Sequence, residues 1–353
     1  LILGEDTDLR NNIADVINKS QRSRGPDNVE KINFSNITLC HQRLSIVGLN
    51  TKFNQPYRWK NLIIVFNGEI YNYYELASNF KLSKNAYEND TACLIELVDS
   101  IGLKKTLSVI DGMYCFAIFD LKKNNLNICT DPFGIKQLYS TNIDNHLIIT
   151  STVSAAKQSL KERGIELNVD LITREWQESF NGTPPGHTQF SEITALEKNS
   201  LYRVELNDNK NYLRKIKNKS EKEIQSYKYE QLDKILGQAL QGVVPAGIML
   251  SGGIDSTSLL SKSKSLDLNL KAFILNNNYD KNSGFAINEV FNASSYAKSA
   301  NIQSHIVNSE GIKRSELEQL FKIIDIPAEV TGALGLLKIC NRISNEYNDI
   351  KYL

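Results

Sequence analysis

The stretch Ser251-Gly252-Gly253-Ile254-Asp255-Ser256 follows an apolar run at 246–250 and precedes a helix-like segment at 257–262. Glycines let backbone N–H groups come close to a phosphate, and a helix N-terminus adds a favourable dipole and unpaired N–H donors. A strand, a glycine turn and the start of a helix therefore predict an anion site. Asp255 is an unexpected charge in such a site, unless a cation such as Mg²⁺ bridges it to the phosphates.

The complete six-residue pattern narrows the type of anion site. It is not a P-loop, because no Gly-Lys-Ser/Thr ends it. It looks like the pyrophosphate loop of ATP pyrophosphatases, which adenylate a substrate and release pyrophosphate. The alternative is an ordinary glycine turn between strand and helix, and the acidic residue inside the pattern makes that alternative the weaker one.

The chain around this loop has a regular alternation of elements. Strands are expected at 246–250, 270–275 and 303–307, and helices at 223–241, 257–264 and 287–300. Such alternation predicts a parallel sheet with helices on its faces, whose ligands bind beyond the C-terminal strand ends. The preceding residues 214–222 have little apolar content and no clear period, which predicts a linker.

The first half of the chain has a different pattern of elements. Its expected helices are 8–20 and 90–101, and its expected strands are 36–47, 61–66, 113–120, 126–130, 146–151 and, as the last one, 200–206. Short strands with two inserted helices predict a layered α+β domain with sheets packed face to face. Asn67-Gly68 after one strand indicates a turn, and Asp90 or Thr91 is the expected N-cap of the second helix.

Composition sets the outer limits. A chain of 353 residues suggests two domains, and a net charge of +1 provides no basic field for nucleic acid. No apolar stretch approaches the roughly 18 residues of a membrane span. Five cysteines without metal-ligand spacing indicate free thiols in a reducing cytoplasm. Leu1 and Leu353 both lie in strand-like sequence, so we expect a fragment that lacks residues at both ends.

Four N-terminal segments are distinctive together. They are Arg24-Gly25-Pro26-Asp27, His41-Gln42-Arg43-Leu44-Ser45-Ile46-Val47, Asn67-Gly68-Glu69-Ile70-Tyr71-Asn72 and Asp131-Pro132-Phe133-Gly134-Ile135-Lys136-Gln137-Leu138-Tyr139. In this order they resemble the glutaminase domain of class II glutamine amidotransferases. Followed by the 251–256 loop, they resemble the glutamine-hydrolysing asparagine synthetase family over nearly the whole chain.

The resemblance implies a fold for each half. Residues 1–213 would form an N-terminal-nucleophile-type glutaminase domain with αββα layers, and residues 214–222 the linker. Residues 223–353 would form an α/β parallel-sheet ATP-pyrophosphatase domain of asparagine synthetase type, incomplete at its C-terminal end.

The resemblance also implies roles in glutamine hydrolysis. The family uses an N-terminal cysteine whose own α-amino group activates the thiol for attack on the glutamine amide. The oxyanion hole matches the Asn67 side-chain amide and the Gly68 backbone N–H. Arg43 matches the residue that holds the glutamine α-carboxylate, and Asp90 the one that pairs with the α-amino group. The remaining glutamine-binding positions are Leu44, Ile46, Val47 and Glu69. Without the resemblance, a hairpin turn, a surface arginine and a helix N-cap would explain these residues.

This sequence departs from the family at the nucleophile. None of the five cysteines occupies the expected position. Either the cysteine directly precedes Leu1, which we favour because the other pocket residues are kept, or glutaminase activity is lost, as in β-lactam synthetases. Smaller departures are Gly48, where many members have Asp, and Gln137, where Pro is frequent. His41 is expected to make a structural bond and not to act as a base.

In the second half, the resemblance assigns nucleotide contacts. The ATP-binding positions are Leu250, Ser251, Gly252, Gly253, Asp255, Ser256 and Leu275, and Asp255 is also the Mg²⁺ ligand. ATP and a carboxylate would give an acyl-adenylate, which ammonia from glutamine attacks to yield an amide, AMP and pyrophosphate.

The favoured acceptor is aspartate, with asparagine as product. The alternatives are another carboxylate on a surface sugar, peptide or secondary metabolite, a β-lactam-synthetase-like member without glutaminase activity, or a binding protein that has lost catalysis. The expected partners are glutamine, ATP and the acceptor, with no nucleic acid and no membrane. The family resemblance is compatible with a homodimer.

Overall fold

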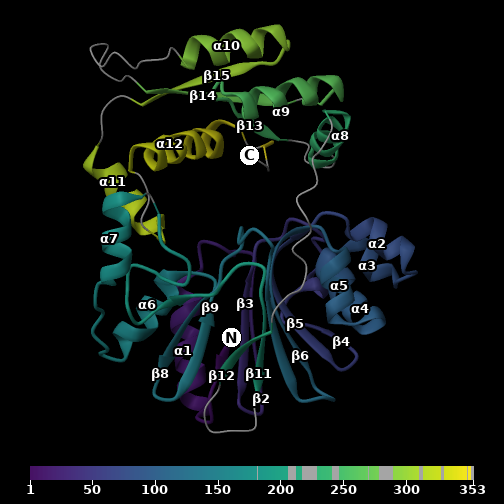
Figure 1. Ribbon diagram of the computed structural model, residues 1–353, viewed down its shortest axis with the longest axis vertical. Coiled ribbons are helices and arrows are strands. Elements are labelled where there is room, and N and C mark those ends of the chain that lie inside the picture. The colour runs from purple at the N-terminus through teal and green to yellow at the C-terminus, as the bar shows by residue number, and fades with distance from the viewer. Residues whose placement is uncertain are drawn as a thin grey trace. The chain divides into compact units, whose positions relative to one another are not determined.

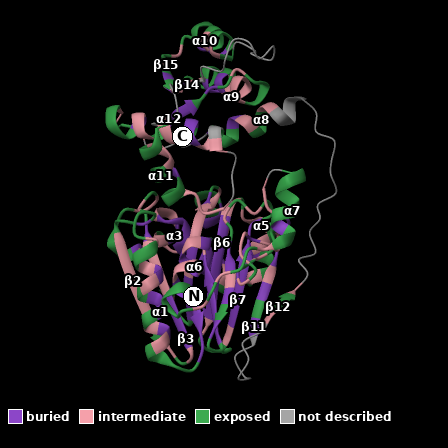
Figure 2. Cartoon of the chain, turned by 90° about the vertical axis from the view of Figure 1, so that its left-hand side faces the viewer, coloured by how far each residue is buried: buried purple, intermediate pink, exposed green. Residues whose placement is uncertain are grey.

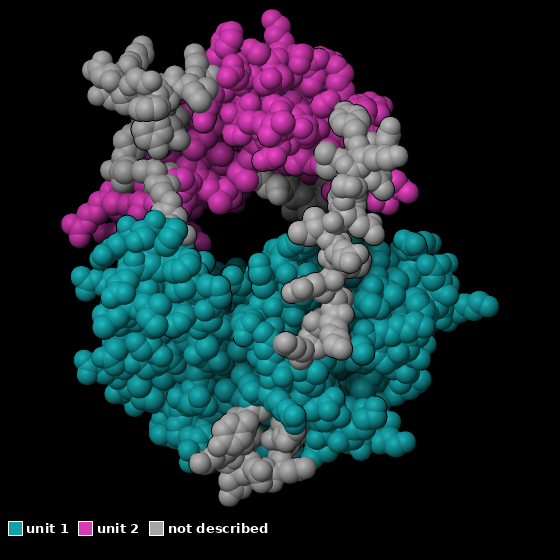
Figure 3. Space-filling view, in the orientation of Figure 1, with its two compact units in different colours: residues 1–221, 325–327 teal, residues 222–324, 328–353 magenta. Residues whose placement is uncertain are grey.

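The computed structural model describes residues 1–180, 182–205, 212–216, 229–240, 246–268, 270–277, 289–309, 313–326, 330–347 and 349–350. The chain forms two compact units, shown in Figures 1 and 3. The first unit comprises Leu1–Glu221 and Asp325–Pro327, and the second comprises Lys222–Ile324 and Ala328–Leu353.

Two six-stranded antiparallel sheets form the centre of the first unit. One sheet has the order β10-β8-β9-β1-β3-β2, with β1 at Ile2–Leu3, β2 at Asn28–Phe34, β3 at Ile37–Arg43, β8 at Tyr139–Ile143, β9 at His146–Thr150 and β10 at Thr194–Ala195. The other has the order β12-β11-β7-β6-β5-β4, with β4 at Tyr57–Trp59, β5 at Leu62–Ile70, β6 at Gly112–Asp120, β7 at Asn125–Thr130, β11 at Leu201–Glu205 and β12 at Tyr212–Ile216.

The two sheets pack face to face through the alternation of side chains along each strand. On β5, Ile63 and Val65 face the other sheet, whereas Ile64 and Phe66 face away from it. Residues of both sheets meet in this inner core, and Figure 2 shows how much of the strands is buried. Because the side-chain period of a strand is two, one face of each sheet builds this core and the other receives helices.

Helices cover both outer faces. Helices α1 (Thr7–Ser20) and α6 (Val153–Glu162) pack on the first sheet. Helices α2 (Tyr73–Asn79), α3 (Lys84–Glu88), α4 (Asp90–Ile101) and α5 (Leu103–Val109) pack on the second. A short 3₁₀ helix, η1, spans Thr51–Phe53, and α7 spans Leu171–Ser179. The predicted αββα layering is confirmed.

Helices α2, α3, α5, α6 and α7 were not predicted, and three local predictions are wrong. Asn67 and Gly68 lie inside β5 and not in a turn, because pairing with β6 continues as far as Ile70. The N-cap of α4 is Asn89, whose side chain accepts a hydrogen bond from the N–H of Ala92, and Asp90 is the first helical residue. Strand β12 follows 201–205, so that run is not the last strand, and β12 extends into the predicted linker at 214–216.

A segment from late in the sequence belongs to the first unit. The carboxylate of Asp325 accepts hydrogen bonds from the backbone N–H groups of Val153 and Ser154, at 2.5 and 2.6 Å. Gln189 donates to the Asp325 carbonyl at 3.0 Å, and Ile326 packs against the core under α1 and α6. Asp325 thus supplies a negative charge at the N-terminus of α6, where the helix dipole favours one.

The second unit is built on a parallel three-stranded sheet, as predicted. Its order is β13-β14-β15, with β13 at Gly247–Met249, β14 at Lys271–Asn277 and β15 at Ser304–Ser309. Helices α9 (Ile254–Ser265) and α10 (Glu289–Ser299) pack on one face and α12 (Val330–Glu346) on the other. Helix α8 spans Tyr229–Ala239, and α11, which the sequence reading did not predict, spans Arg314–Ile323. No helix in the described ranges is long and apolar enough to cross a membrane.

Candidate functional site

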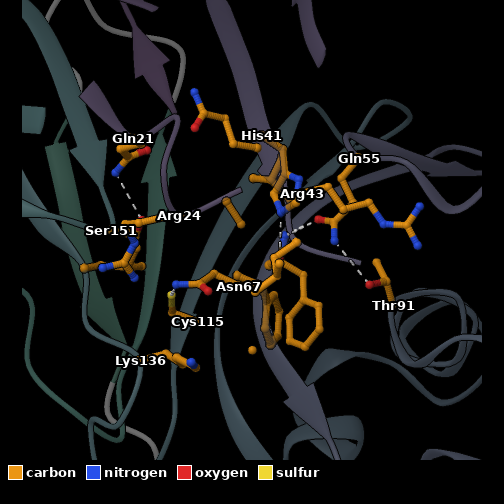
Figure 4. A pocket seen from close by; sticks show the side chains of 18 of the residues that line it. Gln21, Arg24, His41, Arg43, Gln55, Asn67, Thr91, Cys115, Lys136 and Ser151 are labelled. Carbon is orange, nitrogen blue, oxygen red and sulfur yellow. Dashed lines mark hydrogen bonds between the residues drawn. The ribbon is translucent and has the colours of Figure 1, made fainter. Parts of the chain in front are cut away.

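A cavity of about 510 Å³ opens in the first unit where the inner core ends (Figure 4). Its walls come from both sheets and from the start of α4. All eight predicted glutamine-site residues line it: Arg43, Leu44, Ile46, Val47, Asn67, Gly68, Glu69 and Asp90. The structure therefore brings together side chains that are up to 47 positions apart in sequence (43 to 90).

Strand β5 positions Asn67 and Gly68. Asn67 continues the stripe of Ile63 and Val65, so its polar side chain lies where the inner core gives way to the cavity. Gly68 crosses closely over β6, because a Cβ at this position would lie 2.1 Å from the carbonyl oxygen of Met113. Only glycine fits this close approach without moving the backbone. Gly68 itself also lines the cavity.

Arg43 brings a buried positive charge to the cavity. Its side chain is 5% exposed, and its guanidinium donates to the Asn50 carbonyl at 3.0 Å, to Asn54 Oδ1 at 2.8 Å and to the Gly48 carbonyl. Burial lowers the pKa of Arg43. No carboxylate lies within ion-pair distance of it in the described part of the chain, so its direct hydrogen bonds go to neutral oxygens. The charges of Asp27 and Asp90 act on it from further away and oppose the lowering of its pKa.

Asp90 brings a buried negative charge to the same cavity. The side chain is also 5% exposed, and its oxygens accept from the N–H groups of Ile70 at 3.2 Å and Thr91 at 2.8 Å. Burial raises the pKa of Asp90 to about 7, since the two backbone bonds offset only part of the desolvation. Among the residues that the structure describes, no cation pairs with it.

Three further charged side chains line the cavity, Arg24, Glu69 and Lys136. Burial also raises the pKa of Glu69, whereas the positive charge of Lys136 opposes that shift. Lys136 follows a loop whose backbone N–H groups at Phe133, Ile135 and Lys136 all donate to the carboxylate of Asp131. This loop is one of the motifs that carry the family resemblance, but the resemblance assigned no role to Lys136.

His41 makes a structural bond, as predicted. Its Nε2 lies 3.1 Å from the carbonyl oxygen of Phe66, which fixes Nε2 as the donor. Burial lowers the pKa of His41 to about 4, so the ring is neutral near pH 7 and its charge is absent from the cavity. The neighbouring Cys40 packs against the core under α1, on the other side of the strand.

Two cysteines, Cys40 and Cys115, line the cavity, and the thiol of the more deeply buried one, Cys115, is not activated as a nucleophile. Burial raises the pKa of Cys115 to about 12, which keeps the sulfur as a thiol. Leu1 lines the same cavity, and its backbone nitrogen is buried and donates to the carbonyl of Ile149 at 3.1 Å.

The glycine loop of the second unit connects β13 to α9. Gly252 has φ +82°, and Gly253 is the N-cap of α9, which no side chain caps. Ser251 Oγ accepts from the N–H of Gly253 at 3.2 Å and lies 3.1 Å from Ser256 Oγ. The first-turn N–H groups of α9 are therefore available to an anion, which fits the phosphates of ATP.

The same loop offers one carboxylate for a metal ion. Asp255 is exposed in the first turn of α9. No group of three or more His, Cys, Asp or Glu side chains that could hold a metal exists in the described ranges. Asp255 fits Mg²⁺ only as a single protein ligand, with phosphate oxygens and water completing the coordination, as is common for this ion.

The two predicted leucine contacts lie on opposite faces of the parallel sheet. Leu250 is buried in the core beneath α9 and α10, whereas Leu275 packs with the residues that face α12. Leu275 also lies close to α12, since a Cβ at Gly335 would come within 2.2 Å of its side chain. The structure thus does not bring these two side chains together.

Comparison with known proteins supports the family resemblance of both halves of the chain. Residues 2–215 match the family model for a glutamine amidotransferase domain, and residues 229–348 match that for asparagine synthase. The first unit and its cavity therefore define a glutamine amidotransferase domain. The chain belongs to the glutamine-hydrolysing asparagine synthetase family.

Three relatives show the range of similarity. The putative asparagine synthetase [glutamine-hydrolyzing] 1 of Methanocaldococcus jannaschii is 30% identical over 250 residues, which are 68% of this chain and 42% of that protein. Asparagine synthetase [glutamine-hydrolyzing] 1 of Bacillus subtilis is 27% identical over 263 residues, 71% of this chain and 40% of that protein. Amidase chyE of Penicillium rubens is 26% identical over 352 residues, 91% of this chain and 50% of that protein. The chain thus spans about half or less of the length of these relatives.

Proposed function

We propose that the intact protein is an ATP-dependent, amide-forming ligase that hydrolyses glutamine and transfers the ammonia to an acyl-adenylate. The observation that carries the glutaminase half is the pair of buried, opposite charges at one cavity, Arg43 and Asp90, neither of which makes a direct ion pair in the described part of the chain. An isolated buried charge costs free energy unless something pairs with it. A free α-amino acid carries the two complementary charges, a carboxylate for Arg43 and an ammonium for Asp90.

The residues around these charges support amide hydrolysis. The Asn67 amide and the main-chain N–H of Gly68 would donate to the oxyanion that forms when the glutamine side-chain amide is attacked. The proposal includes a cysteine directly before Leu1 as nucleophile, activated by its own α-amino group. Its support is the position of Leu1 in the cavity wall and the buried, unactivated thiol of Cys115.

The second half would form the adenylate. The N–H groups of the 251–256 loop and the start of α9 would hold the pyrophosphate part of ATP. Mg²⁺, held through Asp255, would neutralise charge on the departing phosphates. Leu250, which directly precedes the loop, and Leu275 on the next strand were both predicted nucleotide contacts, but they face opposite sides of the sheet, so we do not propose that both flank one nucleotide. A carboxylate oxygen of the acceptor would attack the α-phosphorus of ATP, the bond to the β-phosphate would break, and pyrophosphate would leave. The acyl-adenylate would remain for attack by ammonia.

We propose aspartate as the acceptor and asparagine as the product. A second candidate is a different carboxylate, and the alignment with amidase chyE, which covers 91% of this chain, favours keeping it. We assign no pocket in the described residues to the acceptor. An experiment is therefore needed to distinguish aspartate from a different carboxylate.

The test uses the full-length protein with glutamine, ATP, Mg²⁺ and aspartate. We expect glutamate, AMP, pyrophosphate and asparagine in equal amounts. AMP formation with a different carboxylate but not with aspartate would replace the acceptor and leave the reaction type intact. Release of ADP and phosphate would contradict adenylation itself.

A further inference from the structure

The thiol of Cys115 contacts the amide that we assign to the oxyanion hole. Asn67 Nδ2 lies 3.7 Å from Cys115 Sγ, within the range of an N–H···S hydrogen bond, and Figure 4 shows this contact in the cavity wall. Cys115 Sγ in turn lies 3.9 Å from the carbonyl oxygen of Gln137, to which the S–H donates. The sulfur therefore connects the amide to a fixed main-chain group.

The strand register produces this contact. Asn67 on β5 is directly opposite Cys115 on β6. Directly opposed residues of an antiparallel pair point to the same face, with Cβ atoms about 4.5–5.5 Å apart. Cys115 is 2% exposed and packs in the inner core, so its sulfur has little freedom to leave the amide.

The bond chemistry sets the orientation of the amide. Because the thiol hydrogen is directed to Gln137, the sulfur presents lone pairs to Asn67. Lone pairs attract the NH₂ end of the amide and repel its oxygen. One N–H of Asn67 is thus directed at the sulfur, and the second remains free on the same nitrogen for an anion in the cavity.

We infer that Cys115 is a positioning residue for glutamine hydrolysis, which holds the Asn67 amide with its NH₂ group toward the developing oxyanion. The inference rests on the proposed glutaminase function. It gives a role to a cysteine that is neither the nucleophile nor part of any metal-ligand group in the described ranges. Cys115 acts only through Asn67, so its effect belongs to the transition state and not to glutamine binding.

The test is a double-mutant cycle on the full-length protein, with glutamine hydrolysis as the assay. We expect Cys115→Ala to lower kcat about three- to tenfold, the range of one weak hydrogen bond, with KM for glutamine unchanged within about twofold. Cys115→Ser keeps a donor and an acceptor and should fall between wild type and Cys115→Ala. In an Asn67→Ala background, Cys115→Ala should have no further effect on kcat.

Cys129 provides the matched control. It is a fully buried cysteine on the neighbouring strand β7, but it faces the core beneath α2–α5 and not the cavity. Cys129→Ala should leave kcat within about twofold of wild type. An equal loss in the two Cys→Ala variants, or the same loss from Cys115→Ala with and without Asn67, would overturn the inference.

The experiment also distinguishes failure of the inference from failure of the proposed function. If Cys115→Ala does not fold, the cycle is run with Cys115→Ser, and equal losses in both Asn67 backgrounds again overturn the inference. A wild-type protein that hydrolyses no glutamine would overturn the proposed function together with this inference. An active wild type with additive losses would overturn the inference alone.

Discussion

At the scale of single residues, the site is defined by two buried charged side chains that make no direct ion pair in the described part of the chain. Arg43 and Asp90 are both 5% exposed, and each is satisfied only by neutral groups. Such residues lower stability and are retained where a ligand completes them. The sequence motifs predicted both positions correctly as members of one cavity, because the family resemblance supplies long-range information.

The first prediction concerns stability and the Asp90 charge. Because the folded pKa of about 7 is raised above the ordinary value, the folded state loses stability as pH rises from about 4 to about 7. Asp90→Asn removes this charge, so the variant should be more stable than wild type at about pH 8 and similar at about pH 4, with a Tm difference of a few degrees at the higher pH. Thermal unfolding at the two pH values measures it. A less stable variant at the higher pH would contradict the burial argument.

The second prediction concerns glutamine hydrolysis and pH. Only ionised Asp90 can pair with the glutamine ammonium, so kcat/KM should rise as pH increases through about 7 in the wild type. Asp90→Asn should raise KM about tenfold or more and remove this limb of the profile. Steady-state kinetics from about pH 5.5 to 8.5 test this. A wild-type profile that is flat across this range would show that Asp90 does not titrate in the free enzyme.

The cavity residues that could not be predicted from the sequence are those whose position depends on the register of strand pairing. Cys115 and Lys136 line the cavity, but nothing local distinguishes Cys115 from the other cysteines. Its position opposite Asn67 follows from the pairing of β5 with β6, which a single sequence does not specify. An alternation of Cys115, Ala117 and Phe119 along the strand was the available signal that these side chains share one face.

At the scale of elements, tertiary pairing overrides local preference. Asn67-Gly68 has the composition of a turn, yet the strand continues through it because β6 lies alongside as far as Gly112. The close crossing at Gly68 explains why glycine is present there without a turn. The linker predicted at 214–222 begins inside β12, which pairs along β11 at the edge of the sheet. Period and turn composition alone cannot detect such pairings.

The third prediction is at this scale and concerns helix α6. Asp325 accepts hydrogen bonds from the N–H groups of Val153 and Ser154, so Asp325→Ala leaves two donors without their partner. We expect a loss of about 1 kcal/mol in the stability of the first unit. Asp325→Asn keeps an acceptor oxygen but loses the charge, so it should lose less. Denaturant unfolding followed by a probe in the first unit measures both, and unchanged stability in Asp325→Ala would contradict the capping role.

At the scale of the whole molecule, two independently built units share one proposed reaction. The first has an αββα fold with a cavity lined by Arg43 and Asp90, and the second has a parallel sheet with the glycine loop at 251–256. The fold class of both units was predicted, from the pattern of strands and helices together with the family resemblance, whereas several helices of the first unit were not. Helices α11 and α12 were not predicted, and the acceptor site has no counterpart in the described residues.

The fourth prediction separates the two units by function. Asp255→Asn removes the carboxylate that we propose for Mg²⁺ and should lower AMP formation at least about tenfold. The same variant should retain glutamine hydrolysis, because the cavity in the first unit is untouched. Parallel assays of glutamate and of AMP measure this, with Asn67→Ala as the reciprocal control. Equal loss of both activities in Asp255→Asn would contradict the assignment of separate sites.

The central claim is that ammonia released at the Arg43–Asp90 cavity attacks an adenylate formed at the 251–256 loop. The most direct test gives the full-length protein glutamine labelled with ¹⁵N in its side-chain amide, together with ATP, Mg²⁺, aspartate and excess unlabelled ammonium. We expect AMP, pyrophosphate and an amide product that carries ¹⁵N. A product amide without ¹⁵N, or consumption of ATP to ADP, would contradict the claim.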